Sequence, residues 1–418
     1  MPTASRILGR TAHIFLCLII WLPTAWAAGA PRKPKVRAIT AFVTIDRTNY
    51  SQKFQQALTM LRQAKSDFEK GGYEVETLRI TTQSFPEYTR GMSKAEALQV
   101  FHALDALATK ESFLLSIGAL ELNSKDSSQA SLLAEALAST NASASLSVAG
   151  DDGVDWNAVR EAAKVIKYLE ENSPNGARNF GFAATAMVPP NVPFFPASYH
   201  EGMGQQFSVG LEAGAFVEDV FAAANGDLKA AATNLQREYT ARALELEKIA
   251  LQVEKESGWA YMGLDATPAP NGDSSIGAAM EKLLGTKFGS SGTLSVAAII
   301  TAAVRSIPAK RAGYSGLMLP PLEDPVLAQR WSEGSYSLDS LLAYSAVCGT
   351  GLDAVALPGD VSQAQLERII GDVASLAVKW HKPLTARLIP APGKKAGDKT
   401  DFNFGYPGFP NLVLKPVD

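Results

Sequence analysis

Hydrophobic and polar positions along the chain follow two alternating periods, which predicts strands interleaved with helices. Residues 36–44 form a β-branched apolar run typical of a buried strand, and residues 52–70 place Phe54, Leu58 and Leu61 at helical spacing. Strands separated by helices of ten or more residues favour parallel pairing, so the pattern indicates an α/β fold. Further strands are expected at 73–81, 112–117, 144–148, 179–187, 261–265, 353–357 and 384–389, and further helices at 94–108, 126–138, 155–171, 227–255, 294–305, 338–347 and 363–378.

Three segments do not fit either period clearly. The tract 138–147 is rich in Ala and Ser and is compatible with a strand or a loop. Residues 189–196 are dense in proline, which excludes regular structure there. The tail from about residue 391 carries several aromatic side chains and is expected to wrap over the body or to close a cleft. No linker divides the chain, so we expect one domain over residues 28–418.

The first 27 residues have the pattern of a secretory signal. Arg6 and Arg10 precede an apolar run over residues 14–22, and residues 25–27 supply a small-x-small cleavage site. The apolar run is shorter than the roughly 20 residues that span a bilayer. We therefore expect cleavage before Ala28 and an exported, periplasmic or secreted protein with no stable membrane span; retention as an N-terminal anchor is the alternative.

Composition narrows the classes of partner. Hydrophobic residues make up 46% of the chain, which is enough for a large core, and the formal net charge of −3 offers no basic surface for nucleic acid. Removal of the signal would leave Cys348 as a single thiol, which cannot form an internal disulfide. This thiol is either a buried core residue or a protected reactive group.

Four polar residues fall at or near the ends of predicted strands: Arg79, Asp265, Asp353 and Arg387. The carboxyl ends of parallel strands line ligand clefts, so these residues are site candidates, with strand-end salt bridges as the alternative interpretation. Guanidinium groups hold a carboxylate in bidentate geometry, which makes Arg79 and Arg387 the candidates for binding a substrate carboxylate.

The remaining candidates lie in two loops. Cys348 is followed by the glycine turn that contains Thr350, which we add to the substrate-binding candidates, and Asp353 follows shortly after. His200 lies after the proline-dense loop and is the best general acid or base candidate, because histidine is scarce and titrates near neutral pH. A core histidine bonded to a carbonyl is the alternative for His200.

Cofactor motifs are incomplete. The glycine patterns at 349–351 and 393–395 lack the dinucleotide and phosphate-loop fingerprints, so no nucleotide cofactor is expected. A divalent cation held by oxygen ligands alone remains open, because hard cations need only such groups. Its candidate ligands are Glu212, Glu323, Asp324 and Asp360.

Ordered motifs run through most of the chain, over residues 35–40, 73–80, 193–200, 208–212, 263–265, 313–324, 344–360 and 382–393. Together they resemble an uncharacterised family, domain of unknown function 711. The resemblance implies a barrel like that of pyruvate formate-lyase, with ten strands in two parallel halves inside a ring of helices. A glycyl radical is not expected, because the glycines at 405 and 408 lack the Arg-Val-Ser/Ala lead.

Two functional hypotheses follow. The first is an exported barrel enzyme that acts on a small carboxylated metabolite by acid/base or metal-assisted lysis or hydrolysis, with His200, Asp265, Asp353 and Cys348 as reacting or positioning groups. The second is a non-catalytic periplasmic protein that binds a small molecule in the same cleft. Export and the lack of a complete catalytic motif favour the second; turnover of a bound ligand would eliminate it, whereas saturable binding without product would support it.

Overall fold

The computed structural model describes residues 30–121, 128–405 and 408–417. The predicted secretory segment lies outside these residues. Residues Pro31–Asp418 group as one compact unit, which is the part discussed below. Among the described helices, none has the length and hydrophobicity that crossing a membrane requires.

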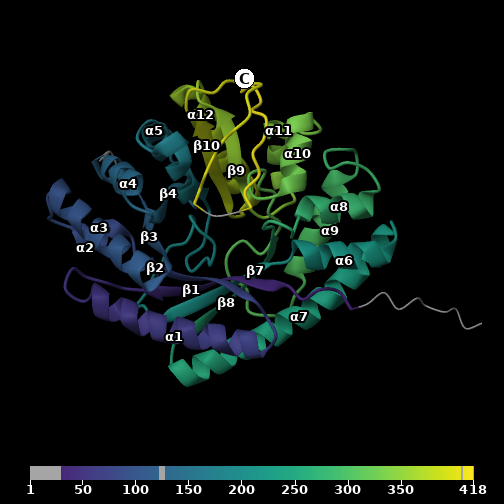
Figure 1. Cartoon of the computed structure of the whole chain (residues 1–418), viewed down its shortest axis with the longest axis horizontal. Coiled ribbons are helices and arrows are strands. Elements are labelled where there is room, and N and C mark those ends of the chain that lie inside the picture. The colour runs from purple at the N-terminus through teal and green to yellow at the C-terminus, as the bar shows by residue number, and fades with distance from the viewer. Residues whose placement is uncertain (1–29, 122–127, 406–407, 418) are drawn as a thin grey trace, which may run out of the picture. The chain divides into compact units, whose positions relative to one another are not determined.

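A ten-stranded mixed sheet organises the fold (Figure 1). Its hydrogen-bonded order is β8-β7-β1-β2-β3-β4-β6-β10-β9, with the short β5 paired to β4. The strands are β1 Lys35–Val43, β2 Val75–Thr82, β3 Leu114–Leu120, β4 Ser143–Gly150, β5 Gly153–Val154, β6 Phe182–Ala186, β7 Gln206–Glu212, β8 Ala260–Ala269, β9 Gly351–Pro358 and β10 Leu384–Ala391.

The pairing divides the sheet into parallel blocks. Strands β1, β2, β3, β4 and β6 run parallel to one another, and so do the pairs β7–β8 and β10–β9. The blocks meet at antiparallel joints, β1 with β7 and β6 with β10. The α/β class is confirmed, whereas the closed barrel is not, because the hydrogen-bonded order ends at β8 and β9.

Helices lie around the outside of the strands (Figure 1). Both β9 and β10 are buried along their whole length, as expected for parallel strands covered on two faces. The helices are α1 Tyr50–Lys70, α2 Phe85–Thr89, α3 Lys94–Glu111, α4 Ser128–Ser139, α5 Trp156–Glu171, the 3₁₀ helix η1 Pro174–Gly181, α6 Gly214–Ala224, α7 Leu228–Ser257, α8 Ile276–Leu284, α9 Thr293–Arg305, α10 Pro325–Glu333, α11 Leu338–Ser345 and α12 Gln363–Trp380.

Local sequence explains where the helices begin and end. Asp227 accepts hydrogen bonds from two backbone N–H groups at the start of α7, and Gly258 ends that helix with a φ of 73°. Ser93 and Glu96 form a reciprocal capping box at the start of α3. Such caps satisfy the backbone groups that a helix end leaves unpaired.

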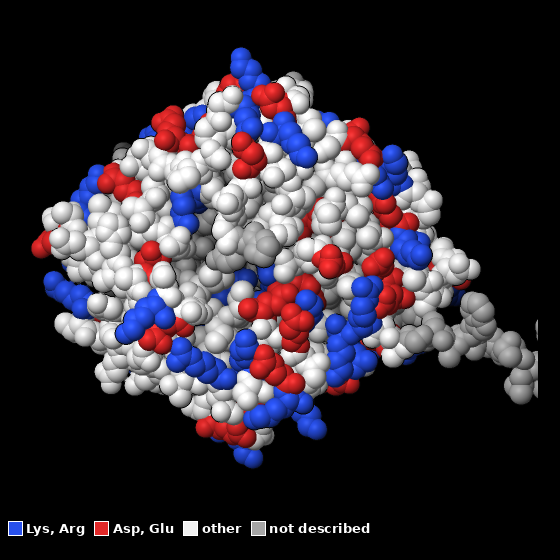
Figure 2. Space-filling view, viewed as in Figure 1, with Lys and Arg blue, Asp and Glu red and all other residues white. Residues whose placement is uncertain are grey.

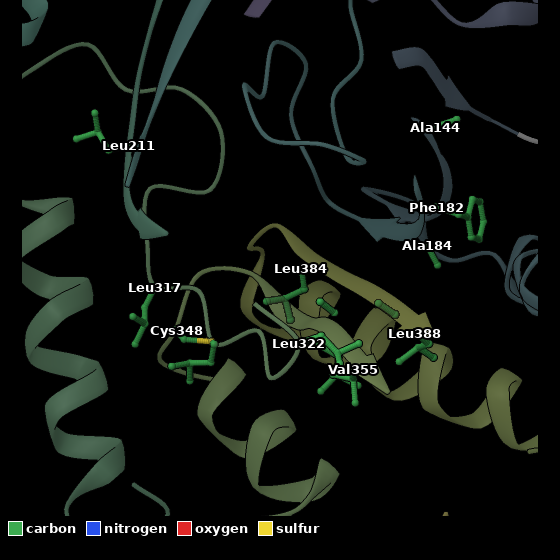
Figure 3. Packing of buried hydrophobic residues seen from close by; sticks show 14 of the residues in the cluster. Ala144, Phe182, Ala184, Leu211, Leu317, Leu322, Cys348, Val355, Leu384 and Leu388 are labelled. Carbon is green, nitrogen blue, oxygen red and sulfur yellow. The ribbon is translucent and has the colours of Figure 1, made fainter. Parts of the chain in front are cut away.

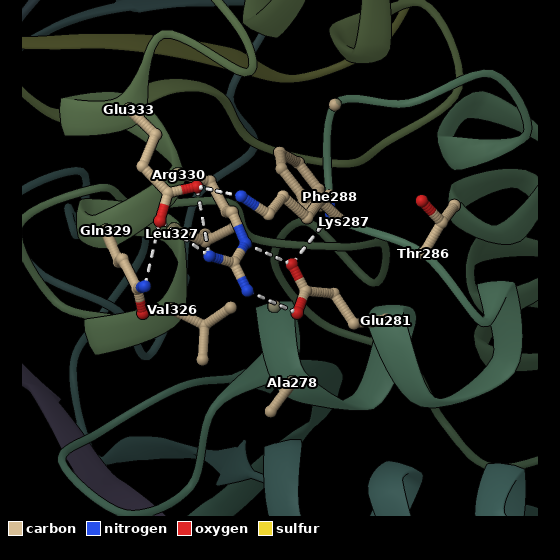
Figure 4. A network of polar contacts seen from close by, with 12 residues as sticks. Ala278, Glu281, Thr286, Lys287, Phe288, Val326, Leu327, Gln329, Arg330 and Glu333 are labelled. Carbon is tan, nitrogen blue, oxygen red and sulfur yellow. Dashed lines mark hydrogen bonds and ion pairs between the residues drawn. The ribbon is translucent and has the colours of Figure 1, made fainter.

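An ion network joins α10 to α8 (Figure 4). The Arg330 guanidinium donates to both carboxylate oxygens of Glu281, at 2.6 and 2.9 Å, and its third nitrogen contacts Glu333 at 2.9 Å. These carboxylates raise the pKa of Arg330 above its usual range. The contact joins two short helices that also bury apolar side chains, such as Met280 of α8 and Trp331 of α10.

Two loops fill the inner face of the sheet, the face opposite the helices. They are residues 188–200 and 313–318, and they share a small apolar cluster that includes Phe194, Tyr314 and Met318. Strand hydroxyl groups anchor the first loop by donating to its carbonyls, from Thr40 to Pro193 at 2.8 Å, from Ser208 to Asn191 at 2.9 Å and from Ser116 to Ser198 at 3.0 Å.

The main core extends along the described sheet, with β9 and β10 as part of it, and it includes the single described thiol (Figure 3). Cys348 is 1% exposed and lies beside Leu317 (Figure 3). The structure therefore places it as a packed core side chain at the point where the second loop meets the chain entering β9.

Several expectations need correction. Seven elements were not anticipated, α2, β5, η1, β7, α6, α8 and α10, because each of them is short. The antiparallel joints were also not anticipated, since the alternating pattern gives no information on strand direction at a block boundary. The second half of the Ala- and Ser-rich tract, residues 143–147, lies in β4, and residues 138–139 end α4, so the strand alternative holds for half of the tract.

Gly316 and Gly349 allow the loop of residues 313–318 to pass in direct contact with the backbone that precedes β9. A Cβ on Gly316 would lie 2.3 Å from the Gly349 Cα, and a Cβ on Gly349 would lie 2.5 Å from the Gly316 Cα. Both neighbours are backbone atoms that cannot move aside, so we expect Gly316→Ala to lower the free energy of unfolding by about 1–3 kcal/mol in chemical denaturation.

Gly150→Ala is the matched control, because a Cβ there meets nothing within 4 Å. Equal stability of the Gly316→Ala and Gly150→Ala variants would contradict this direct contact.

Candidate functional site

The segment Lys310–Glu323 bridges the two end strands of the sheet. At β8, the Leu264 N–H donates to the Lys310 carbonyl at 2.8 Å, and the Ala312 N–H donates back to the Leu264 carbonyl at 3.1 Å. At β9, the Leu322 N–H donates to the Ala354 carbonyl at 3.3 Å. The segment therefore occupies the space between β8 and β9 with its own backbone hydrogen bonds.

Asp265 on β8 fixes the turn at the start of this segment. Its buried carboxylate accepts from the Tyr314 N–H at 2.7 Å, from the Ser315 N–H at 3.0 Å, and from the Thr267 hydroxyl at 2.6 Å. Burial raises the pKa of Asp265 to about 6, and these hydrogen bonds oppose the rise. A Cβ on Gly313 would lie 2.1 Å from the same carboxylate, at a φ of +62°, so only glycine fits there.

A cavity of about 510 Å³ opens beside this turn. That volume is within the range typical of small-molecule sites. Its wall contains four positions with left-handed φ, at Met187, Asn191, Gly313 and Ser315, three of which are not glycine. Backbone strain of this kind is concentrated at functional sites. The lining residues are Met187, Pro189, Pro190, Asn191, Met262, Arg305, Arg311, Ala312, Gly313, Tyr314, Ser315 and Pro383.

Two arginines give this cavity its charge. Arg305 ends α9, and Arg311 lies in the bridging segment, where one of its guanidinium nitrogens donates to the Arg305 carbonyl at 2.9 Å. Within the described part of the chain, neither guanidinium lies within ion-pair distance of a carboxylate. The site thus presents two solvent-exposed positive charges that the described residues do not pair with a carboxylate.

A second charged group lies at the far end of the bridging segment. The Arg387 guanidinium on β10 lies 2.8 Å from an Asp353 carboxylate oxygen on β9, and it also contacts Glu323. Burial raises the pKa of Asp353 to about 6; Arg387 opposes the rise and Glu323 adds to it. Phe180 covers the guanidinium at 4.4 Å from the ring centre. Arg387 is therefore neutralised by the protein's own carboxylates.

Tyr314 lies between the two charged groups. It lines the cavity, and its hydroxyl group contacts the Thr385 hydroxyl two residues before Arg387 on β10. Burial raises the pKa of Tyr314 above its usual range, so the phenol stays protonated at neutral pH. The side of the cavity that Tyr314 lines is therefore uncharged.

His200 and Arg79 have separate environments. His200 is 3% exposed, with one ring nitrogen 3.1 Å from the Thr44 hydroxyl, and burial lowers its pKa to about 4. Arg79 is buried below the ring of Phe195, and its Nε donates to the Thr77 hydroxyl at 3.0 Å. The predicted pair Arg79 and Arg387 thus belongs to two different sets of contacts.

Cys348 and Thr350 support the bridging segment. The Thr350 hydroxyl donates to the Leu317 carbonyl at 3.1 Å, and the Gly349 N–H donates to the same carbonyl at 3.0 Å. The buried Lys382 ammonium contacts the Cys348 carbonyl and the Ser345 carbonyl, the latter at 2.8 Å. These contacts fix the position of the backbone that follows α11.

The four candidate cation ligands do not come together. Asp324 caps α10 and accepts from Ser275 at 2.7 Å, and Glu323 pairs with Arg387. Asp360 is exposed after β9. Over residues 30–121, 128–405 and 408–417, no three His, Cys, Asp or Glu side chains are grouped so that they could hold a metal ion.

Glu212, the fourth candidate, lies beside another carboxylate. Burial and the neighbouring Glu76 raise the pKa of Glu212 to about 8. Lys35 lies 3.7 Å from Glu76 and 3.8 Å from Glu212, and Arg37 binds Glu76 at 2.8 Å. Protonation of Glu212 and the positive charges of Lys35 and Arg37 thus offset the repulsion between the two carboxyl groups.

Sequence reasoning missed Arg305, Arg311 and the role of Tyr314. Tyr314 lies inside the 313–324 stretch that was singled out, but the two arginines carry no motif. The only available signal was that Arg305 ends a predicted helix and Arg311 follows it after a short turn.

Asp265→Asn tests the anchoring of the turn. An amide offers one acceptor oxygen where the carboxylate offers two, and its NH₂ group would face backbone donors. We expect the free energy of unfolding to fall by about 2–4 kcal/mol in urea titration. Asp360→Asn, at an exposed site, is expected to change it by less than about 0.5 kcal/mol. A neutral Asp265→Asn variant would refute the anchoring role.

His200 gives a pH prediction. Its folded pKa of about 4 lies below the ordinary value of 6.5, so between these pH values the folded state binds fewer protons than the unfolded state. The stability that neutral His200 contributes is complete above pH 6.5 and is lost as the pH falls towards 4, by about 3 kcal/mol at most.

The measurement is the free energy of unfolding at several pH values. His200→Gln is expected to lose less stability on acidification than the wild type, whereas a variant of the exposed His102, His102→Gln, is expected to follow the wild type. Parallel curves for His200→Gln and wild type would show that His200 does not titrate in this way.

Comparison with known proteins identifies relatives but no activity. The family model described as "Uncharacterised ACR (DUF711)" matches residues 30–403. A UPF0210 protein from Pyrobaculum arsenaticum is 36% identical over 66% of this chain and 62% of its own length. UPF0210 proteins from Pyrobaculum islandicum and Syntrophobacter fumaroxidans are 31% and 32% identical, over 80% and 79% of this chain and 78% and 77% of their own lengths. The chain thus spans less than two thirds of the Pyrobaculum arsenaticum relative.

A solved structure also shows similarity. It is the anaerobic ribonucleotide reductase from Thermotoga maritima in complex with dATP and CTP, with a TM-score of 0.40 and 8% identity over 84% of this chain and 75% of that chain.

These matches correct the functional prediction. An exported enzyme for a small carboxylated metabolite, with an exported binding protein as the alternative, is contradicted, because the matched family is described only as uncharacterised and its archaeal and bacterial relatives give no support for export. The resemblance drawn from the motifs is confirmed. The chain belongs to the uncharacterised family DUF711.

Proposed function

We propose that this protein binds a small molecule carrying a phosphate-type dianion in the cavity beside the Asp265 turn. The observation that carries the proposal is the pair Arg305 and Arg311, two guanidinium groups that line one cavity without carboxylate partners among the described residues. Arg330 and Arg387, in contrast, each pair with two carboxylates.

The number of positive charges favours phosphate over a carboxylate. One carboxylate has two oxygens and satisfies one guanidinium fork, whereas a phosphate group offers three oxygens and close to two negative charges. Both arginines are solvent exposed and line the same cavity, so a dianion there could contact both guanidinium groups. A phosphate group matches both the charge and the donor count.

The cavity lies where strands of both directions meet. Met187 and Asn191 follow the carboxyl end of β6, whereas Pro383 immediately precedes β10 and Met262 lies near the start of β8. Acidic and basic side chains are interspersed over the face in Figure 2, which is therefore not uniformly basic. Attraction of an anion therefore depends on the local pair of arginines.

Binding of inorganic phosphate and pyrophosphate by calorimetry tests the proposal. Arg311→Met keeps most of the apolar stem but removes the charge, and we expect it to weaken phosphate binding about tenfold or more, as lost charge-assisted hydrogen bonds of about 1.5–3 kcal/mol require. Arg305→Met is expected to act in the same direction.

Arg368→Met is the matched control, because Arg368 is exposed on α12, away from the cavity lining. Its affinity for phosphate is expected to equal that of the wild type. Absence of phosphate binding by the wild type, or equal losses in all three variants, would overturn the proposal.

A further inference from the structure

We infer that the natural ligand of this cavity is a phosphate ester of an apolar, ring-containing group rather than a sugar or polyol phosphate. The inference rests on the proposed function, because it takes the two arginines as the site of the phosphate. It concerns the rest of the ligand, which the remaining wall of the cavity must recognise.

The wall beyond the arginines is mostly apolar. Met187 and Met262 supply thioether side chains, and the proline rings of Pro189, Pro190 and Pro383 supply rigid apolar surface. Thioethers pack well against aromatic rings, and proline rings cannot donate a backbone hydrogen bond. These groups suit a ring and offer no partner to a hydroxyl group.

The polar side chains that line the cavity are mostly occupied. The Tyr314 hydroxyl contacts Thr385, and the Ser315 hydroxyl donates to the Ala312 carbonyl at 3.0 Å. The Met262 sulfur accepts from the Gln206 amide at 3.4 Å, which fixes that side chain in place. Asn191 is 7% exposed; its side-chain oxygen is buried without a partner, so its amide NH₂ is the polar group that it can offer to a ligand.

Desolvation then selects between ligands with the same phosphate. Each hydroxyl of a polyol phosphate would leave water and find few partners, which costs free energy. An aromatic ring would instead gain from leaving water and from contact with the Tyr314 ring and the methionines. The volume of about 510 Å³ leaves room for such a group beside the phosphate.

Calorimetric titration with three probes separates this inference from the proposed function. The probes are inorganic phosphate, glycerol 3-phosphate and phenyl phosphate. We expect phenyl phosphate to bind at least about tenfold more tightly than the other two, the effect of burying one ring. Glycerol 3-phosphate binding as tightly as phenyl phosphate would overturn the inference while leaving the phosphate site in place.

Variants of the wall make the test specific. Met262→Ser is expected to remove most of the advantage of phenyl phosphate and to leave inorganic phosphate unchanged, whereas Arg311→Met is expected to weaken all three probes. If Met262→Ser weakened the binding of inorganic phosphate as much as that of phenyl phosphate, the apolar wall would not be selective and the inference would fail.

Failure of every probe to bind the wild type would remove the proposed function as well. Circular dichroism and the denaturation midpoint of each variant distinguish lost binding from lost folding.

Discussion

The buried carboxylate of Asp265 is the constraint on which the candidate site depends. A charged or half-charged group inside a protein is stable only if donors surround it, and here two of those donors are backbone N–H groups of the loop that fills the sheet interior. The strand therefore dictates the path of the loop. Gly313 is required at the closest point of that path, and the Tyr314 ring is placed between the cavity and the Arg387 group.

Arginine has two different roles in this fold. Arg387 and Arg330 are internal cations, each neutralised by carboxylates from another element, and their main effect is to join β10 to β9 and α10 to α8. Arg305 and Arg311 have no such partners in the described chain and line an open cavity instead. The presence or absence of carboxylate partners is what distinguishes an arginine that stabilises the fold from one that could bind a ligand. Burial alone would have selected Arg387 as the ligand-binding residue.

The sequence was sufficient for the α/β class and for most long elements, because a helix such as α7 repeats its apolar period over many turns and β1 is a continuous β-branched run. It was insufficient for α8 and α10, whose nine residues each contain too few periods to be distinguished from a loop. Strand direction at β1–β7 and β6–β10 was inaccessible for a different reason, since the pattern of one strand carries no information about its partner.

The same division holds for the site. Asp265, Asp353 and Arg387 were singled out because they lie in or beside strands, where position follows from the period. Arg305 and Arg311 come from a helix end and a loop, and only the folded chain shows that they line one cavity. The tentative cation ligands lie apart because each carboxylate has a local task, such as the cap that Asp324 provides for α10.

The two antiparallel joints have a consequence for how the chain reaches its native state. Strand β1 is made early in synthesis and pairs with β7, and β6 pairs with β10, the last strand. Both edge strands of the β1–β6 block therefore pair with strands that are far away in the sequence. Contacts between residues that are distant in sequence slow folding. Until β10 is available, β6 is an uncovered strand edge, so the nascent chain passes through a stage in which edge-to-edge association competes with completion of the sheet.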